Sequence, residues 1–144
     1  MHRVMRLLAS ALVVSGIAGF ASAEEAPMEI SGARTVNAEQ IVPLINSTPG
    51  LVIIDSRKPE DFDKGAIEKA IAVTDTDMTS EVLGHVVPSK VTPVLFYCNG
   101  VKCGRAAKAV VKAVTWGYTN VYYYALGMAE WQNLGLPLTH QVAQ

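Results

Sequence analysis

A cysteine thiol and a cation lie close together in one short segment of this chain of 144 residues. The apolar run 94–97 leads directly to Cys98, and a polar stretch then reaches Arg105 at the start of an alanine-rich segment. A thiol between the end of a strand and the first turn of a helix has its thiolate stabilised by backbone N–H groups, the helix dipole and a nearby cation. We therefore expect Cys98 to be a nucleophile. The structural alternative is that Cys98 is a small buried residue that closes the strand.

The residues after Cys98 are suited to binding an anion. Backbone N–H groups at the start of a helix, together with a fixed cation, attract negatively charged groups. We expect the substrate to be bound by Asn99, Gly100, Val101, Lys102, Cys103, Gly104 and Arg105. Lys102 either supports this binding or is an ordinary solvated lysine.

The second thiol, Cys103, lies in the same loop as Cys98. A disulfide between them would close a very short loop, stabilise the fold little and block the nucleophile. We therefore favour a reversible role, in which Cys103 attacks a persulfide or disulfide on Cys98 or passes sulfur onward. The alternative that Cys103 is simply a loop residue stays open, because the spacing is not that of a C-x-x-C redox pair.

Segments with strand and helix patterns alternate along the chain. Strands are predicted at 33–36, 51–54, 70–73, 91–97 and 120–125. Helices are predicted at 38–46, 59–63, 78–86, 104–115 and 128–133. We expect Asn37 to cap the first helix, Pro43 to interrupt it, and pairing of the fourth strand to begin after Pro93. The alternation predicts an α/β fold around a parallel sheet, with Asp55, Cys98 and residues 125–127 at the carboxyl edge where ligands bind.

Several other conspicuous residues are assigned structural roles. Asp55 is expected to accept hydrogen bonds from neighbouring backbone, and Arg57 to pair with Glu60 or Asp61. The aromatic rings of residues 122–124 alternate in direction along a strand, so we expect core packing for them. The histidines lack partners at metal-ligand spacing, and we expect neither a metal nor a cofactor.

The segments around Cys98 resemble, in their order and spacing, a single rhodanese (sulfurtransferase) domain over about residues 31–138. The matching segments are 52–62, 65–67, 97–107, 116–122, 127–131 and 135–137. The resemblance implies a rhodanese-like three-layer sandwich, with a central, mainly parallel sheet and helices on both faces. It also implies that Cys98 takes a sulfane sulfur as a persulfide, surrounded by loop amides.

The chain departs from the family pattern in three places. The loop usually reads C-x4-R, but here six residues separate Cys98 from Arg105. The usual Gly-His-Ile is Gly65-Ala66-Ile67, and the usual Gly-Gly before the last helix is Leu126-Gly127. The longer loop predicts a wider pocket or a displaced arginine, whereas the other two changes concern packing.

Three function classes remain. The first is a sulfurtransferase that moves sulfur from thiosulfate or a persulfide to a thiol or cyanide acceptor, with a protein acceptor as a further option. The second is a Cys-dependent phosphatase or arsenate reductase, although its C-x5-R spacing is also absent. The third is a non-catalytic sulfur carrier or binding module. The presence of Cys98 argues against an inactive domain.

The amino end has the pattern of a secretory signal. A basic start precedes the apolar stretch 7–20 and the small residues 21–23, so we expect residues 1–23 to be removed. Residues 24–30 are expected to form a disordered leader and residues 31–140 the rhodanese domain.

Without Arg3 and Arg6 the chain has three more acidic than basic residues, so nucleic acid is not an expected partner. We expect a periplasmic or secreted protein with no stable membrane association after signal removal.

Overall fold

The computed structural model describes residues 24–140. The predicted signal sequence, residues 1–23, lies outside the described residues. Strands and helices alternate in the order β1 (Ala33–Thr35), α1 (Ala38–Ser47), β2 (Val52–Asp55), α2 (Pro59–Phe62), β3 (Ala70–Ala72), α3 (Ser80–Val86), β4 (Val94–Tyr97), α4 (Arg105–Thr115), β5 (Val121–Tyr124) and α5 (Gly127–Asn133).

The five strands form one sheet in the order β1-β5-β4-β2-β3, and every neighbouring pair is parallel. Strand β4 lies at the centre and all four of its residues are buried. Asp55 at the end of β2 is in register with Tyr97 at the end of β4, which is in register with Tyr124 at the end of β5. The carboxyl ends of the three inner strands therefore meet along one edge, as predicted.

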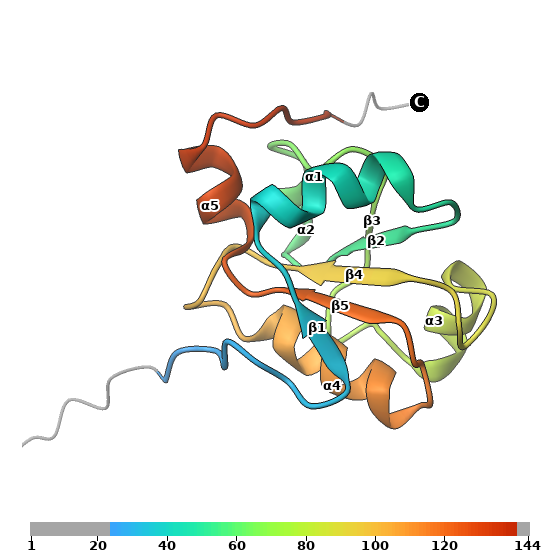
Figure 1. Ribbon diagram of the computed structural model, residues 1–144. Helices are drawn as coiled ribbons and strands as arrows, with labels where there is room; N and C mark the ends of the chain where they lie inside the picture. Colours follow the sequence, from blue (N-terminus) through green and yellow to red (C-terminus); the bar gives the residue numbers. More distant parts are fainter. Residues whose placement is uncertain (1–23, 141–144) are drawn as a thin grey trace, which may run out of the picture.

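Helices cover both faces of the sheet and give a three-layer α/β sandwich (Figure 1). One core cluster joins α1, α2 and α5 to one face of the sheet, through residues that include Ile41, Phe62 and Trp131. The other joins α3 and α4 to the opposite face, with Leu83 and Val110 among its members. Alternate strand residues belong to opposite clusters, because side chains in a strand point to the two faces in turn.

Helix α1 differs from its prediction at Pro43. Asn37 caps the helix through a capping box with Gln40, as expected for this position. The helix then continues without a break through Pro43 to Ser47. Proline removes one backbone hydrogen-bond donor from the helix. The helix nevertheless continues, because the buried side chain of Ile41 packs the helix against the sheet. The prediction of an interruption was therefore wrong.

Residues 24–30 contain no helix or strand, but they contact the domain. The backbone N–H of Ala26 donates to the carbonyl of Val101 at 2.6 Å. The hydroxyl of Tyr123 donates to the carbonyl of Pro27 at 2.9 Å. This segment, expected to be a disordered leader, thus runs beside the loop that follows Cys98.

Within residues 24–140 no helix is both long enough and apolar enough to cross a membrane.

A buried ionic network lies at the carboxyl edge of the sheet. Asp55 is completely buried, and its carboxylate accepts hydrogen bonds from the backbone N–H, Nε and Nη2 of Arg57 at 2.6–3.0 Å. The expected backbone hydrogen bond to Asp55 is confirmed. The expected pairing of Arg57 with Glu60 or Asp61 was wrong, because the buried guanidinium needs an equally buried carboxylate to offset its desolvation. Arg57 also donates to the carbonyl of Gly65 at 2.7 Å.

The hydroxyl of Tyr97 completes this network. It donates to the Asp55 carboxylate at 2.5 Å and accepts from the backbone N–H of Ile67 at 3.1 Å. Burial and the negative charge of Asp55 raise the pKa of Tyr97 far above its ordinary value. Burial opposes the charge on Arg57, but the hydrogen bond and charge of Asp55 hold the pKa of Arg57 above its ordinary value. The residue immediately before Cys98 is therefore fixed by a charged network.

We predict that Tyr97→Phe lowers the free energy of unfolding by about 1–3 kcal/mol, because Asp55 loses a donor and the Ile67 N–H loses its acceptor in the interior. Urea denaturation measures this change. Tyr122→Phe is the matched control, since within the described residues its hydroxyl makes no hydrogen bond, and we expect a change within about 0.5 kcal/mol. Equal effects of the two substitutions would contradict a special role for the Tyr97 hydroxyl.

Candidate active site around Cys98

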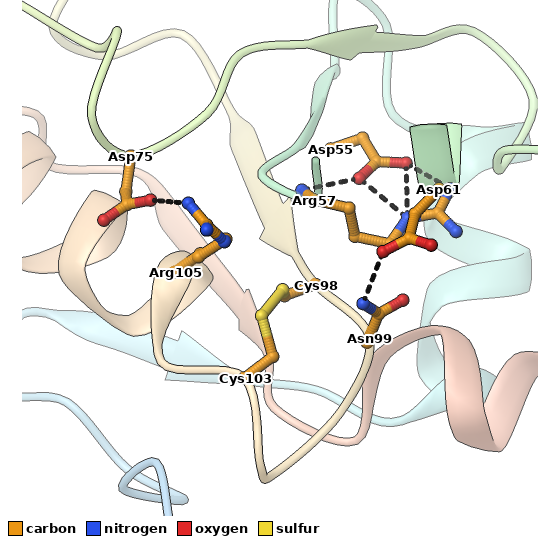
Figure 2. Close-up of a disulfide and its surroundings, with 8 residues drawn as sticks. All are labelled: Asp55, Arg57, Asp61, Asp75, Cys98, Asn99, Cys103 and Arg105. Carbon is orange, nitrogen blue, oxygen red and sulfur yellow. Dashed lines mark hydrogen bonds and ion pairs between the residues drawn. A yellow bond between two sulfur atoms is a disulfide. The ribbon is translucent and has the colours of Figure 1, made fainter. Parts of the chain in front are cut away.

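Cys98 and Cys103 form a disulfide in the loop that joins β4 to α4. Figure 2 shows the disulfide with the Asp75–Arg105 pair on one side and the Asp55–Arg57 network on the other. The Cα atoms of the two cysteines lie 6.2 Å apart, which is within the usual range for a disulfide. Cys98 is only 2% exposed in this state, whereas Cys103 is partly exposed. The structure therefore shows the oxidised form, in which the expected nucleophile is covered.

The start of the loop is held by the last helix. The backbone N–H groups of Met128 and Ala129 donate to the carbonyls of Cys98 and Asn99 at 2.9 and 2.8 Å. The close contact between the start of α5 and the loop requires glycine at position 127. A Cβ there would clash with the carbonyl of Cys98, and the backbone has a positive φ of 55°. The change from Gly-Gly to Leu126-Gly127 thus keeps the glycine that the loop contacts.

A side-chain contact ties the loop to α2. The amide of Asn99 donates to the carboxylate of Asp61 at 3.0 Å. This hydrogen bond, followed by that of Lys64, lowers the pKa of Asp61. Asn99 is exposed, so the contact orients the wall of the site and contributes little to the core.

Arg105 begins α4 and points to an aspartate from a distant segment. Its guanidinium pairs with the carboxylate of Asp75 at 2.9 Å, and the two side chains are 31% and 9% exposed. Asp75 follows β3 and is also held near α4 by Lys112, whose ammonium donates to its backbone carbonyl at 2.5 Å. The charge of Arg105 is thus partly balanced by Asp75 before any anionic ligand binds.

A cavity of about 720 Å³ lies between the loop, α2 and α4. Its lining includes the cations Lys58, Lys64, Lys102, Arg105 and Lys108. Three carboxylates also line it, on Glu60, Asp61 and Asp75. Since Asp61 pairs with Lys64 and Asp75 with Arg105, the remaining lysines give the cavity an excess of positive charge. Such a cavity attracts small anions.

The loop also borders a second cavity, of about 510 Å³, formed with Ala129 of α5. Cys103 lines both cavities, whereas Cys98 lines neither. A further hollow beside β1 has a volume of about 900 Å³ but contains neither cysteine. The two cavities beside the loop are therefore the ones that bear on thiol chemistry.

The structure brings most of the predicted site residues together. The lining of the first cavity includes Asn99, Lys102, Cys103, Gly104 and Arg105, and that of the second includes Gly100 and Val101. Sequence reasoning missed Asp61 and Asp75 as walls of the site. The sequence could have indicated Asp75, because this residue follows a predicted strand and so lies at the carboxyl edge of the sheet, where ligands bind. Among residues 24–140 no group of three acidic, histidine or cysteine side chains is placed to hold a metal ion.

Solved structures share this fold. The BH2092 protein from Bacillus halodurans superimposes with a TM-score of 0.65 at 20% identity, over 75% of this chain and 77% of that one. The polysulfide-sulfur transferase homodimer from Wolinella succinogenes gives a TM-score of 0.62 at 20% identity, over 78% and 82% of the two chains. At these identities the likeness concerns the fold, which is one found in sulfurtransferases.

Comparisons of sequence agree with the structural ones. The chain is 28% identical over 109 residues to the uncharacterised Escherichia coli K12 protein YibN, a match that spans 75% of this chain and 73% of the relative. The model of the rhodanese-like domain matches residues 37–134, which include every strand and helix from α1 to α5 and leave out only β1 among the described elements. The chain therefore belongs to the rhodanese-like domain family.

Proposed function

We propose that this protein is a sulfurtransferase that moves a sulfane sulfur from thiosulfate or a persulfide donor to a thiol or cyanide acceptor. The observation that carries the proposal is the place of Cys98, directly after the central strand of a rhodanese-like fold and at the start of a loop that lines a cationic cavity. Membership of the family and the fold support the class of reaction.

In the proposed reaction the Cys98 thiolate attacks the outer sulfur of the donor. With thiosulfate, the bond between the two donor sulfur atoms breaks, sulfite leaves, and Cys98 carries a persulfide. An acceptor thiol or cyanide then takes the outer sulfur and restores the Cys98 thiolate. The disulfide must be reduced before the first step, because it occupies the Cys98 sulfur.

The cations around the loop suit an anionic donor. Lys102 and Lys108 line the cavity with no hydrogen bond or ion pair to a carboxylate in the described part of the chain. Arg105 at the amino end of α4 adds a third charge, partly balanced by Asp75. We propose that these side chains bind the sulfonate end of thiosulfate. This end is negatively charged and becomes the leaving sulfite.

We also propose that the protein acts outside the cytoplasm. The basic and apolar pattern of residues 1–23 supports export. The Cys98–Cys103 disulfide suits an oxidising compartment, where such bonds persist. Amino-terminal sequencing of the protein recovered from cells would then read from near Glu24, whereas an intact Met1 in all of the protein would contradict removal of the signal.

We predict that Cys98→Ser abolishes sulfur loading without unfolding the protein, because serine is nearly isosteric but its alkoxide is inaccessible at neutral pH. Reduced wild-type and variant proteins are incubated with thiosulfate, and intact mass and thiocyanate formation from cyanide are measured. One added sulfur atom in the wild type alone is the expected result. Sulfur loading of the variant would remove Cys98 as the nucleophile, and turnover of phosphate esters or arsenate without sulfur loading would favour the second function class.

We predict that Arg105→Ala raises the KM for thiosulfate about tenfold, since a charge-assisted contact to the donor is lost. The KM for an uncharged persulfide donor should change much less. Lys90→Ala is a charge-matched control, because Lys90 is exposed before β4, at the opposite edge of the sheet. An equal rise in KM for both donors would mean that Arg105 maintains the structure of the loop through its contact with Asp75.

A further inference from the structure

We propose that the two cysteines give this protein a second activity, the reductive release of bound sulfane sulfur as hydrosulfide. The proposal rests on the proposed function, since it begins from the persulfide on Cys98. Cys103 then acts as a resolving thiol: it attacks Cys98, expels the outer sulfur and leaves the disulfide that the structure shows.

The bonds and electrons of this step balance within the loop. The sulfur of Cys103 bonds to Sγ of Cys98, and the bond between that Sγ and the outer sulfur breaks. The outer sulfur leaves as hydrosulfide with the proton of the Cys103 thiol. The two cysteine sulfurs are oxidised to a disulfide, and the sulfane sulfur is reduced to sulfide. A dithiol reductant regenerates the two thiols for another cycle.

The backbone around the loop favours this intramolecular attack. The N–H of Cys103 donates to the carbonyl of Gly100 at 2.9 Å, which folds the chain between the two cysteines into a turn. The carbonyl of Cys98 is held by the N–H of Met128 at 2.9 Å. None of these contacts involves a sulfur atom, so reduction of the disulfide removes none of their donors or acceptors. A thiol held in this way competes well against thiols in solution, because the attack is unimolecular.

The difference in exposure between the two cysteines determines how the disulfide is reopened. Cys103 is partly exposed and borders both cavities, whereas Cys98 is 2% exposed. An external thiolate therefore attacks Cys103 and displaces Cys98 as the leaving thiolate. The loop continues directly into α4 and Arg105, and a helix amino terminus with a cation favours a thiolate on the loop. Reduction thus returns Cys98 in the form that the next donor requires, while the second thiol of the reductant frees Cys103.

The test follows the fate of a single sulfur atom. Wild-type protein is reduced, freed of reductant and mixed without oxygen with one equivalent of thiosulfate, and sulfite, sulfide and intact mass are recorded. We expect about one equivalent each of sulfite and sulfide, and a final mass that shows the disulfide and no added sulfur. The rate of sulfide release should not depend on protein concentration.

Cys103→Ala and the more conservative Cys103→Ser provide the comparison. In both variants the sulfide released per sulfite should fall at least about tenfold, because no resolving thiol is present, and the added sulfur should stay on Cys98. Sulfite release by the wild type with a stable persulfide and no sulfide would overturn the resolving role but leave the sulfurtransferase proposal intact. Sulfide release by both variants at the wild-type rate would also overturn the resolving role of Cys103. No sulfite and no added sulfur in any of the reduced proteins would overturn both proposals.

Discussion

The carboxylate of Asp55 has no access to solvent, and much of the carboxyl edge of the sheet is arranged to satisfy it. A buried charge of this kind is very unfavourable unless a cation and hydrogen-bond donors accompany it. Arg57 supplies the cation, and Tyr97 supplies a donor from the neighbouring strand. Because Tyr97 directly precedes Cys98, the same network fixes the point at which the chain leaves the sheet and enters the loop.

From that point the loop is held by contacts on three sides. Helix α5 binds the carbonyls of its first two residues, α2 binds the side chain of Asn99, and α4 continues from its end. These contacts involve backbone amides and side-chain oxygens. The sulfur atoms take no part in these contacts, which are supplied by the rest of the domain.

The sequence allowed the order and type of every described element to be predicted, because four of the five strands are short, mainly apolar runs and the longest helices have amphipathic spacing, with Asn37 as a cap on α1. The position of Cys98 at the end of a buried strand followed from the same patterns. The partners of the charged residues did not. Arg57 was assigned to Glu60 or Asp61, whereas its actual partner, Asp55, is both nearer in the sequence and as deeply buried as the guanidinium. The pairing of Arg105 with Asp75 joins segments 30 residues apart, and no local pattern marks such a contact.

The hydrogen bond from Ala26 to the carbonyl of Val101 makes the amino-terminal segment a tether on the loop. Val101 lies between the two cysteines, so a pull on this tether acts on the turn that brings the thiols together. A force or a bulky group applied at the amino end would reach the loop through this backbone contact, ahead of the hydrogen bond between Tyr123 and Pro27. The opposite end of the described chain has a different attachment, since Thr139 pairs with Ala66. The choice of terminus for immobilising the protein is therefore also a choice about how freely its two sulfur atoms can approach each other.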